Sequence, residues 1–380
     1  MTENRQKEYF GVGSTKELKN ILNDRKVSKV FLVTGKKSFT ESGIGSKIKE
    51  LLVGFEVKRF FDFDTNPKIE DIEKGLKEFR DFSPDIIVAI GGGSVIDIAK
   101  SVGILADENG SIEDFVLGKA KLNDRKVSLV AIPTTSGSGS EATHFAAIGI
   151  GDTKYALAHP SLLPEFAIVD PELTYSLSPK ITAETGADAL CQAIESYWSI
   201  NSTNESKEYA KESMKLSFLN LKDAVFDPNE LSRSAMAKAS FLAGKAINIS
   251  KTTACHAFSY PLTSRYGIVH GHAVALTLPE VLLYNSEIGE VGVNDSRGVE
   301  YLKENIREIV EVLGFENPSV AASSLKKLFE DIGFHMSLSD FGIKDEDISF
   351  IIENVGYERL KNNPRKIDTE TAKKILENIL

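Results

Sequence analysis

Residues 85–100 read Asp85-Ile-Ile-Val-Ala-Ile-Gly-Gly-Gly-Ser-Val-Ile-Asp-Ile-Ala-Lys100. The apolar run of residues 86–90 is typical of a strand in a parallel sheet that is covered on both faces. Gly91, Gly92, Gly93 and Ser94 then let the backbone approach a pyrophosphate, and the start of the next helix offers free N–H groups and a positive dipole end. Strand-to-helix turns also use glycine in folds that bind nothing, and this is not the Gly-x-Gly-x-x-Gly fingerprint. The stretch therefore predicts an α/β fold and a candidate nucleotide site.

Further apolar, β-branched runs surround this one along the first half of the chain. A helix is predicted between the second and third runs, with Asn66 as its cap candidate and Pro67 in its first position. Strands alternating with such helices indicate a parallel sheet with helices on both faces. We expect residues 1–172 to form a Rossmann-like dinucleotide-binding domain. The other predicted strands are residues 27–34, 55–63, 127–132 and 166–169.

A second polar loop, residues 133–141, follows the predicted strand at residues 127–132. Thr134, Thr135 and Ser138 bring hydroxyl and backbone donors to the carboxyl end of that strand. Because the carboxyl ends of parallel strands meet at one edge of a sheet, we expect this loop to share a cleft with the glycine turn.

Strand signals disappear beyond about Thr182, and glycines stand near the ends of several helical patterns. We expect residues 173–380 to form a helical metal- and substrate-binding domain. The predicted helices are residues 205–226, 230–249, 294–313, 318–332, 345–355 and 368–380.

Two polar clusters in the helical half suggest a metal site. Asp188 and Gln192 are four residues apart, so both side-chain oxygens lie on one face of a helix. His270 follows a turn-rich loop and opens another apolar segment, so His256 could come from the end of one helix and His270 from the start of the next. Two imidazoles, a carboxylate and an amide oxygen suit one divalent ion such as iron, zinc or manganese.

Other interpretations of these residues stay open at this point. A histidine is more often a surface or satisfied core residue than a ligand. The two cysteines, Cys191 and Cys255, could join Asp188 and His256 in a zinc site, although that arrangement strands His270. Free cysteines are also common as small buried apolar residues.

The composition is that of an ordinary globular protein of two domains. The 380 residues are 42% hydrophobic, and the net charge of −10 has no basic stripe, which argues against nucleic acid and anionic membranes as partners. No apolar signal core stands at the start, and the longest apolar stretch, residues 273–283, is interrupted by polar residues and proline. With only two cysteines, we expect a cytoplasmic protein.

The motifs together resemble the iron-containing (group III) alcohol dehydrogenase family, from Phe10-Gly-Val-Gly13 to Asn363-Pro-Arg365. Asp188, His256 and His270 match the metal ligands of that family. Gln192 stands where the family has a ligand histidine, and Tyr260 where many members have a further active-site histidine. The segments starting at Asp188 and His270 are most similar to the phosphonoacetaldehyde reductase, or 2-hydroxyethylphosphonate dehydrogenase, branch.

The resemblance implies a metal-dependent NAD(P)-linked oxidoreductase that acts on a small alcohol or aldehyde and forms a homodimer. It assigns the glycine turn and the polar loop of residues 133–141, here called the Thr134 loop, to the cofactor, and we add Asn66 and Lys154. Members that exclude the adenosine 2′-phosphate often have an acidic residue at the Gly35 position. Glycine there, followed by Lys36 and Lys37, predicts that NADP(H) is favoured over NAD(H). An ordinary turn with solvated lysines is the alternative.

Two residues are predicted to take part in catalysis. His272, a cofactor hydroxyl or water could pass the proton, and Arg265, on the loop between His256 and His270, could pair with a phosphonate. The implied reaction is reduction of phosphonoacetaldehyde to 2-hydroxyethylphosphonate. The alternatives are a general short-chain alcohol or diol dehydrogenase, a dehydroquinate synthase-type lyase, and a metal-free nucleotide-binding relic.

Overall fold

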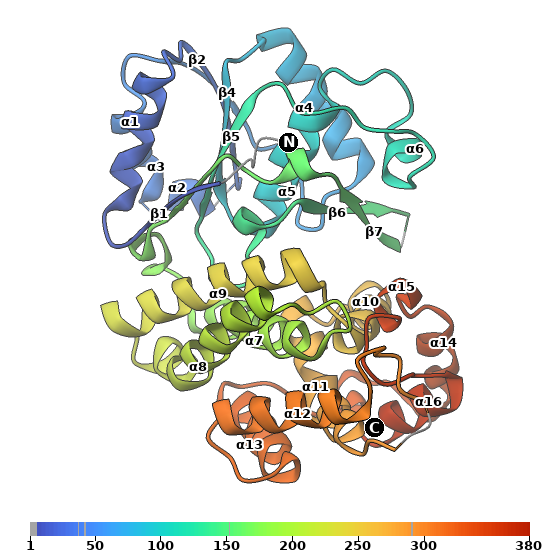
Figure 1. Cartoon of the computed structure of the whole chain (residues 1–380). Coiled ribbons are helices and arrows are strands. Elements are labelled where there is room, and N and C mark those ends of the chain that lie inside the picture. The colour runs from blue at the N-terminus through green and yellow to red at the C-terminus, as the bar shows by residue number, and fades with distance from the viewer. Residues whose placement is uncertain (1–5, 37, 42, 152, 290–291) are drawn as a thin grey trace. The chain divides into compact units, whose positions relative to one another are not determined.

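The computed structural model describes residues 6–36, 38–41, 43–151, 153–289 and 292–380. The chain divides into two compact units, residues 1–177 and 178–380, shown in Figure 1. Each unit has its own hydrophobic core.

A six-stranded sheet forms the centre of unit 1, with every described strand pair parallel. All five predicted strands are present, and a sixth, β1, was missed because it is short and largely exposed. Every residue of β4 is buried, as its unbroken apolar run indicated. In spatial order the strands are β1 (Lys7–Phe10), β8 (Phe166–Val169), β5 (Ser128–Pro133), β4 (Ile86–Gly91), β2 (Lys29–Thr34) and β3 (Glu56–Phe60).

Helices cover both faces of this sheet. Side chains of α1 and α3 share one core with the sheet, and those of α4 and α5 share the other, on opposite sides of the strands in Figure 1. The helices are α1 (Glu17–Asp24), α2 (Ser38–Glu41), α3 (Ile44–Leu51), α4 (Ile69–Phe82), α5 (Gly93–Leu105) and α6 (Ile112–Val116). Short 3-10 turns are η1 (Ser14–Lys16), η2 (Ser140–Ala142), η3 (Pro160–Leu162) and η4 (Pro171–Thr174).

Two features of unit 1 differ from expectation. An antiparallel hairpin of β6 (Phe145–Ile150) and β7 (Thr153–Ala158) was not predicted. Helix α4 begins at Ile69 with Lys68 as its cap, so Asn66 is not the cap. Asn66 instead has a φ of 62°, a left-handed conformation that asparagine tolerates better than most residues.

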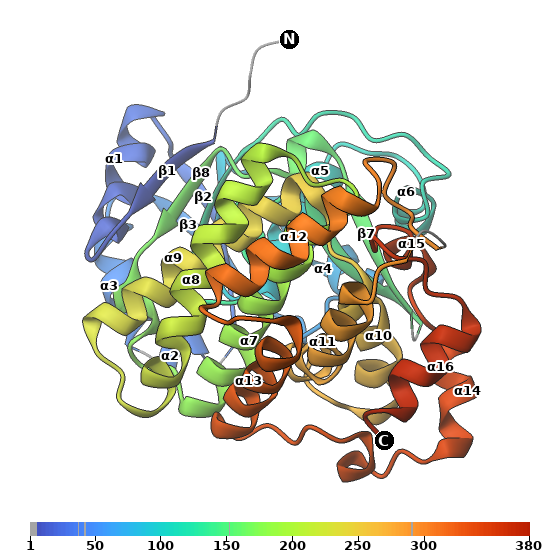
Figure 2. The same cartoon turned by 60° about the horizontal axis from the view of Figure 1, so that its bottom comes forward.

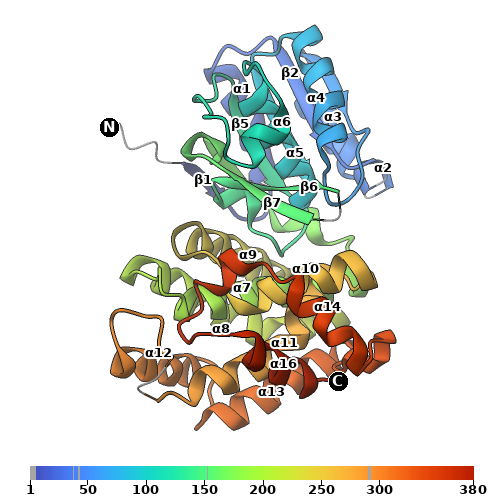
Figure 3. The same cartoon turned by 90° about the vertical axis from the view of Figure 1, so that its right-hand side faces the viewer.

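Every element described in unit 2 is helical. Helices α7, α8 and α9 pack against one another, and α11 packs against α7, α10 and α13; Figures 2 and 3 show this arrangement from two further directions. The longer helices are α7 (Pro179–Trp198), α8 (Asn204–Phe226), α9 (Glu230–Ser250), α10 (Ala254–Tyr266), α11 (His270–Ser286), α12 (Val299–Val312) and α13 (Pro318–Asp331). The remainder are η5 (Leu338–Phe341), η6 (Asp345–Asp347), α14 (Ile348–Glu353), α15 (Tyr357–Leu360) and α16 (Thr369–Glu377).

The architecture is thus a Rossmann-like α/β unit followed by an all-α unit, which confirms the predicted fold class. A search of the described helices finds none with the length and apolar character needed to cross a membrane.

Candidate functional site

The glycine turn lies where β4 and β5 end side by side, with Gly91 opposite Pro133 in the register. A Cβ added to Gly93 would lie 2.7 Å from Ser138 Oγ, and one added to Gly92 would lie 3.2 Å from Thr135 Oγ1. The turn and the Thr134 loop therefore touch, and they can do so because residues 92 and 93 have no side chain.

Three more of the predicted cofactor residues gather beside this turn. Lys154 Nζ on β7 donates to Asn66 Oδ1 at 2.6 Å, and Asn66 N donates to Ser94 Oγ at 3.3 Å. The left-handed backbone of Asn66 is what turns its N–H toward Ser94. A cation, an amide and a hydroxyl are thereby held next to the helix start expected to receive phosphates.

Two charged residues of α5 that sequence reasoning missed, Asp97 and Lys100, hold the Thr134 loop through hydrogen bonds. Lys100 on α5 donates to Ser140 Oγ at 3.0 Å and to Thr143 Oγ1 and the Phe145 carbonyl at 2.9 Å. Asp97 accepts from Ser140 Oγ at 2.6 Å. The sequence did carry a signal for these two residues. Asp97 and Lys100 are charged, lie three residues apart and follow the glycines on a helix that is otherwise apolar and buried.

Gly35 and Lys36 follow β2 at the same carboxyl edge of the sheet. The Lys36 side chain is exposed. The third residue predicted here, Lys37, lies outside the described residues.

Helices α7, α10 and α11 bring together three of the four predicted metal ligands. One ligand atom from each of Asp188, His256 and His270 lies within 4.8 Å of the other two. His256 Nε2 is 3.4 Å from Asp188 Oδ1, and His270 Nε2 is 3.8 Å from the same oxygen. Gln192 lies one turn after Asp188 on α7 and is buried. We call this cluster of Asp188, Gln192, His256 and His270 the candidate metal centre.

The polar atoms of this centre test whether a metal ion fits. Among the described residues, Asp188 Oδ1, Gln192 Oε1 and His256 Nε2 are buried without any hydrogen-bond partner. Buried polar atoms are nearly always paired, and leaving one unpaired costs about 1–3 kcal/mol. Two oxygens and a nitrogen converging unpaired, with His270 beside them, match the donors that a borderline divalent ion prefers. The residues therefore fit the ion that the sequence implied.

Glu195, which sequence reasoning also missed, supports His256 from behind. Its Oε2 lies in a short hydrogen bond with His256 Nδ1. Its Oε1 accepts from Thr253 Oγ1 at 2.9 Å and from the N–H of Cys255 at 2.8 Å, which caps the start of α10. A proton held on Nδ1 leaves the lone pair of Nε2 facing Asp188, the arrangement that metal-binding histidines need.

The charges of this group shift the pKa values in a consistent direction. Burial alone would lower the pKa of His256, but the negative charges of Glu195 and Asp188 raise it to about 9. Burial would raise the pKa of Asp188, but the adjacent imidazoles of His256 and His270 hold it below its usual value. Glu195 could have been found from its spacing, because residues 188, 192 and 195 form one stripe on α7.

Tyr260 has a cationic neighbour from the far end of the chain. Pro261 has no N–H, so the carbonyl of Ala257 lacks its usual helical partner, and Gly356 N donates to it at 3.3 Å. This contact docks α15 on α10 and brings the Arg359 guanidinium to 4.8 Å from the centre of the Tyr260 ring. Arg359 Nη1 also donates to Thr252 Oγ1 at 2.8 Å. Tyr260 is one turn from His256, so a positive charge lies beside the helix that carries this candidate metal ligand.

The two residues predicted for catalysis lie elsewhere in unit 2. His272 Nε2 donates to the His335 carbonyl at 2.8 Å, and its ring stacks on Phe334 with centroids 4.0 Å apart. Residues two apart on a helix point in nearly opposite directions, which explains why His272 turns away while His270 faces Asp188. In this structure His272 therefore faces His335 and Phe334.

Arg265 is exposed in the last turn of α10, where it lies 5.3 Å from the centre of the Phe350 ring. It follows His256 by nine residues, which on a helix is about 13 Å along the axis and half a turn around it. The structure does not bring it to the metal centre. Both cysteines are buried free thiols, and burial raises the pKa of each well above its usual value, so neither supplies a ready thiolate ligand.

Two family models cover nearly the whole chain. The one described as iron-containing alcohol dehydrogenase matches residues 6–171, and the Fe-containing alcohol dehydrogenase family, C-terminal, matches residues 182–380. This chain belongs to the iron-containing alcohol dehydrogenase family. It is an oxidoreductase that acts on CH–OH groups with NAD(P), and the family implies a divalent metal.

Individual relatives of this alcohol dehydrogenase differ in substrate. Phosphonoacetaldehyde reductase from Streptomyces viridochromogenes is 34% identical over 79% of this chain and 77% of its own length. NADPH-dependent butanol dehydrogenase from Clostridium saccharobutylicum is 30% identical over 97% of this chain and 95% of its own. The structure of sulfoacetaldehyde reductase from Bifidobacterium kashiwanohense with NAD+ superposes with a TM-score of 0.89 at 31% identity, covering 98% of this chain and 96% of that one.

Proposed function

We propose that this alcohol dehydrogenase reduces a small aldehyde to its alcohol, with a divalent ion held by Asp188, Gln192, His256 and His270. The observation that carries the proposal is that three buried atoms able to ligate a metal converge beside His270 without hydrogen-bond partners. When bound, the ion polarises the substrate carbonyl as a Lewis acid and the nicotinamide supplies the hydride. The match to the alcohol dehydrogenase models leaves the lyase alternative without support.

The residues of the chain have separate tasks in this proposal. Glu195 holds the proton on His256 Nδ1, so the lone pair of Nε2 is available to bind the metal ion. Asp97 and Lys100 hold the Thr134 loop against the glycine turn, where the cofactor phosphates are expected. No described side chain is assigned the final proton transfer, and a cofactor hydroxyl or water fills that role.

Metal analysis and two ligand variants test this function. We expect purified protein to contain close to one divalent ion per chain. His256→Ala and His270→Ala should lose the ion and turnover while NADPH still binds with nearly parental affinity. Glu195→Gln should weaken metal binding by about 10–100-fold. Full aldehyde reduction by a rigorously metal-free preparation would overturn the proposal.

We propose phosphonoacetaldehyde as the substrate. The relatives named phosphonoacetaldehyde reductase and sulfoacetaldehyde reductase support an aldehyde that carries a tetrahedral anion. A buried anion needs a cationic partner, and the Arg359 guanidinium on Tyr260 is a candidate in unit 2. A general short-chain alcohol dehydrogenase is the second candidate, because the butanol dehydrogenase matches more of this chain. Comparing kcat/KM for phosphonoacetaldehyde and butanal separates the two.

We further propose that NADP(H) is preferred over NAD(H) and that the active form is a homodimer. The absence of an acidic side chain at Gly35 supports the cofactor preference, and the family resemblance supports the dimer. Cofactor titrations and light scattering in solution measure these two properties.

A further inference from the structure

Arg59 lies beside the turn that follows β2. It pairs with Leu32 in the register of β2 and β3, close to the carboxyl end of the sheet's edge strand. Its Nε donates to Thr34 Oγ1 at 2.8 Å, and its Nη2 donates to the Gly35 carbonyl at 2.9 Å. The guanidinium is thus fixed directly against Gly35.

Two aromatic rings fix the plane of this guanidinium. Its central carbon lies 4.7 Å from the Phe39 ring centre and 4.5 Å from that of Phe61. Stacking and hydrogen bonding together remove most of the rotational freedom of an arginine side chain. The charge is therefore held in place before any ligand arrives.

Among the described residues, no carboxylate pairs with the Arg59 guanidinium. Within residues 6–380, masked positions aside, no carboxylate lies within 4.0 Å of Arg59, and its Nη1 donates no hydrogen bond. Elsewhere in unit 1 the buried Arg125 has Glu165 as its partner at 2.8 Å. A half-buried, rigid guanidinium with an unused donor is a receptor for an anionic group.

The position of Gly35 indicates which anion. In open α/β sheets the pyrophosphate sits at the glycine turn, and the adenosine ribose is read at the end of the neighbouring strand. The glycine turn here follows β4, which lies between β5 and β2, and the Thr134 loop follows β5. On the other side of β4, Thr34 at the end of β2 pairs with Ile90. The ribose 2′-position therefore falls near Gly35.

We propose that Arg59 determines cofactor specificity by binding the adenosine 2′-phosphate of NADP(H). This inference rests on the proposed preference for NADP(H) and names the residue responsible for it. Lys36 is exposed and solvated, so it is a weaker competitor for the phosphate than the pre-positioned guanidinium.

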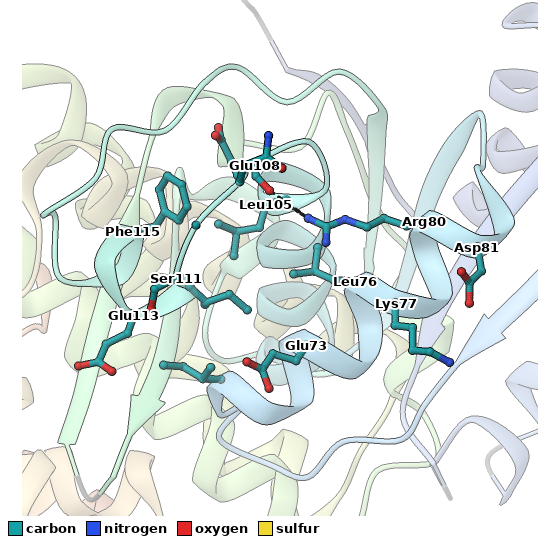
Figure 4. A pocket seen from close by; sticks show the side chains of 14 residues that line it. Glu73, Leu76, Lys77, Arg80, Asp81, Leu105, Glu108, Ser111, Glu113 and Phe115 are labelled. Carbon is teal, nitrogen blue, oxygen red and sulfur yellow. Dashed lines mark hydrogen bonds between the residues drawn. The ribbon is translucent and has the colours of Figure 1, made fainter.

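Fluorescence titration of the full-length metal-containing protein with NADPH and NADH tests the inference. Arg59→Met should weaken NADPH binding by at least about tenfold, the scale of one lost charge-assisted hydrogen bond, while NADH binding changes less than about twofold. Arg59→Lys should retain an intermediate preference. Arg80 supplies the matched control, because its guanidinium also binds backbone carbonyls, those of Leu105, Ala106 and Glu108. Figure 4 shows Arg80 on α4 pointing toward Leu105 and Glu108. Arg80→Met should leave the ratio of the two affinities unchanged.

A second variant keeps the test decisive if Arg59→Met folds poorly. A Cβ at Gly35 would meet only the rotatable Ser38 hydroxyl at 2.3 Å, so Gly35→Asp can place a carboxylate next to the intact Arg59. It should weaken binding of adenosine 2′,5′-bisphosphate far more than that of AMP. Equal losses for NADPH and NADH in Arg59→Met would overturn the inference in favour of a structural role. An unchanged ratio of the affinities for adenosine 2′,5′-bisphosphate and AMP in Gly35→Asp would also overturn it. A parent protein that prefers NADH would instead refute the proposed cofactor preference itself.

Discussion

Gly271 and the carbonyl of Glu184 are so close that a Cβ on residue 271 would lie 1.8 Å from that oxygen. The same Cβ would lie 3.3 Å from Asp188 Cβ. The first turn of α11 can therefore approach α7 only because residue 271 is glycine, and this approach sets the distance between His270 and Asp188.

Gly271→Ala should force the two helices apart. A backbone clash of this size in a buried contact costs about 1–3 kcal/mol or more. We expect metal affinity to fall by at least about tenfold. The loss in the free energy of metal binding should exceed the loss in the free energy of unfolding. Gly289→Ala is the control, because a Cβ there meets nothing within 4 Å. Metal titration and chemical denaturation measure the two effects, and parental metal affinity in Gly271→Ala would contradict this account of the helix contact.

Gln192→His should tighten the metal site. An imidazole nitrogen is a stronger donor than an amide oxygen toward borderline divalent ions, so we expect affinity to rise by about tenfold. The parent should correspondingly lose its ion more readily during dialysis against a chelator. The rate of metal loss from the two proteins measures this, and equal rates would show that residue 192 does not ligate.

Arg359→Met should reduce kcat/KM for phosphonoacetaldehyde by about tenfold to a hundredfold, as expected when a charged hydrogen bond is lost. Its kcat/KM for butanal should change little. Arg265→Met is the matched control, since Arg265 also stacks on an aromatic ring but at the distal end of α10. Losses of the same size on both aldehydes in Arg359→Met would indicate that the residue serves the docking of α15 alone.

The stability of unit 1 should depend on pH through Glu141 and Lys100. Burial raises the pKa of Glu141 to about 7 and lowers that of Lys100 to about 8. The folded state then binds more protons than the unfolded state between about pH 4.5 and 7, so stability falls with rising pH there. Between about pH 8 and 10.5 the unfolded state binds more protons, and stability rises again.

Glu141→Gln isolates the first part of this profile. The variant should lose most of the fall between pH 4.5 and 7, where the slope can reach at most about 1.4 kcal/mol per pH unit for one group. Denaturant titrations followed by far-UV circular dichroism at a series of pH values measure it. A profile identical to that of the parent would show that Glu141 is ionised in the folded protein across this range.

The sequence was sufficient for features governed by local pattern. The unbroken apolar run before Gly91 and the helical periodicity of unit 2 predicted most elements, because burial on two faces and a 3.6-residue repeat leave direct traces. Strand β1 was missed because only sheet pairing with β8 orders its exposed residues. The β6–β7 hairpin was missed because its two strands are rich in alanine and glycine, which are uncommon in strands.

Side-chain direction was harder to predict than element type. Arg265 was placed near the metal by its position between two ligands, but helix geometry turns it half a revolution away from His256. Arg359 could not be foreseen, because more than 100 residues separate it from Thr252 and only the donor missing at Pro261 brings them together. Glu195 was within reach, since it continues the stripe of Asp188 and Gln192.

The docking of Gly356 on Ala257 also bears on how such enzymes diversify. Helices α7, α10 and α11 carry the candidate metal centre, whereas the side chain over Tyr260 comes from a short separate segment whose contact with α10 includes the backbone hydrogen bond from Gly356 to Ala257. Because the Gly356–Ala257 contact is between backbone atoms, it does not depend on the side chain at position 359. Under the proposed role of Arg359, substitutions there would alter the preferred aldehyde while the reaction itself is conserved.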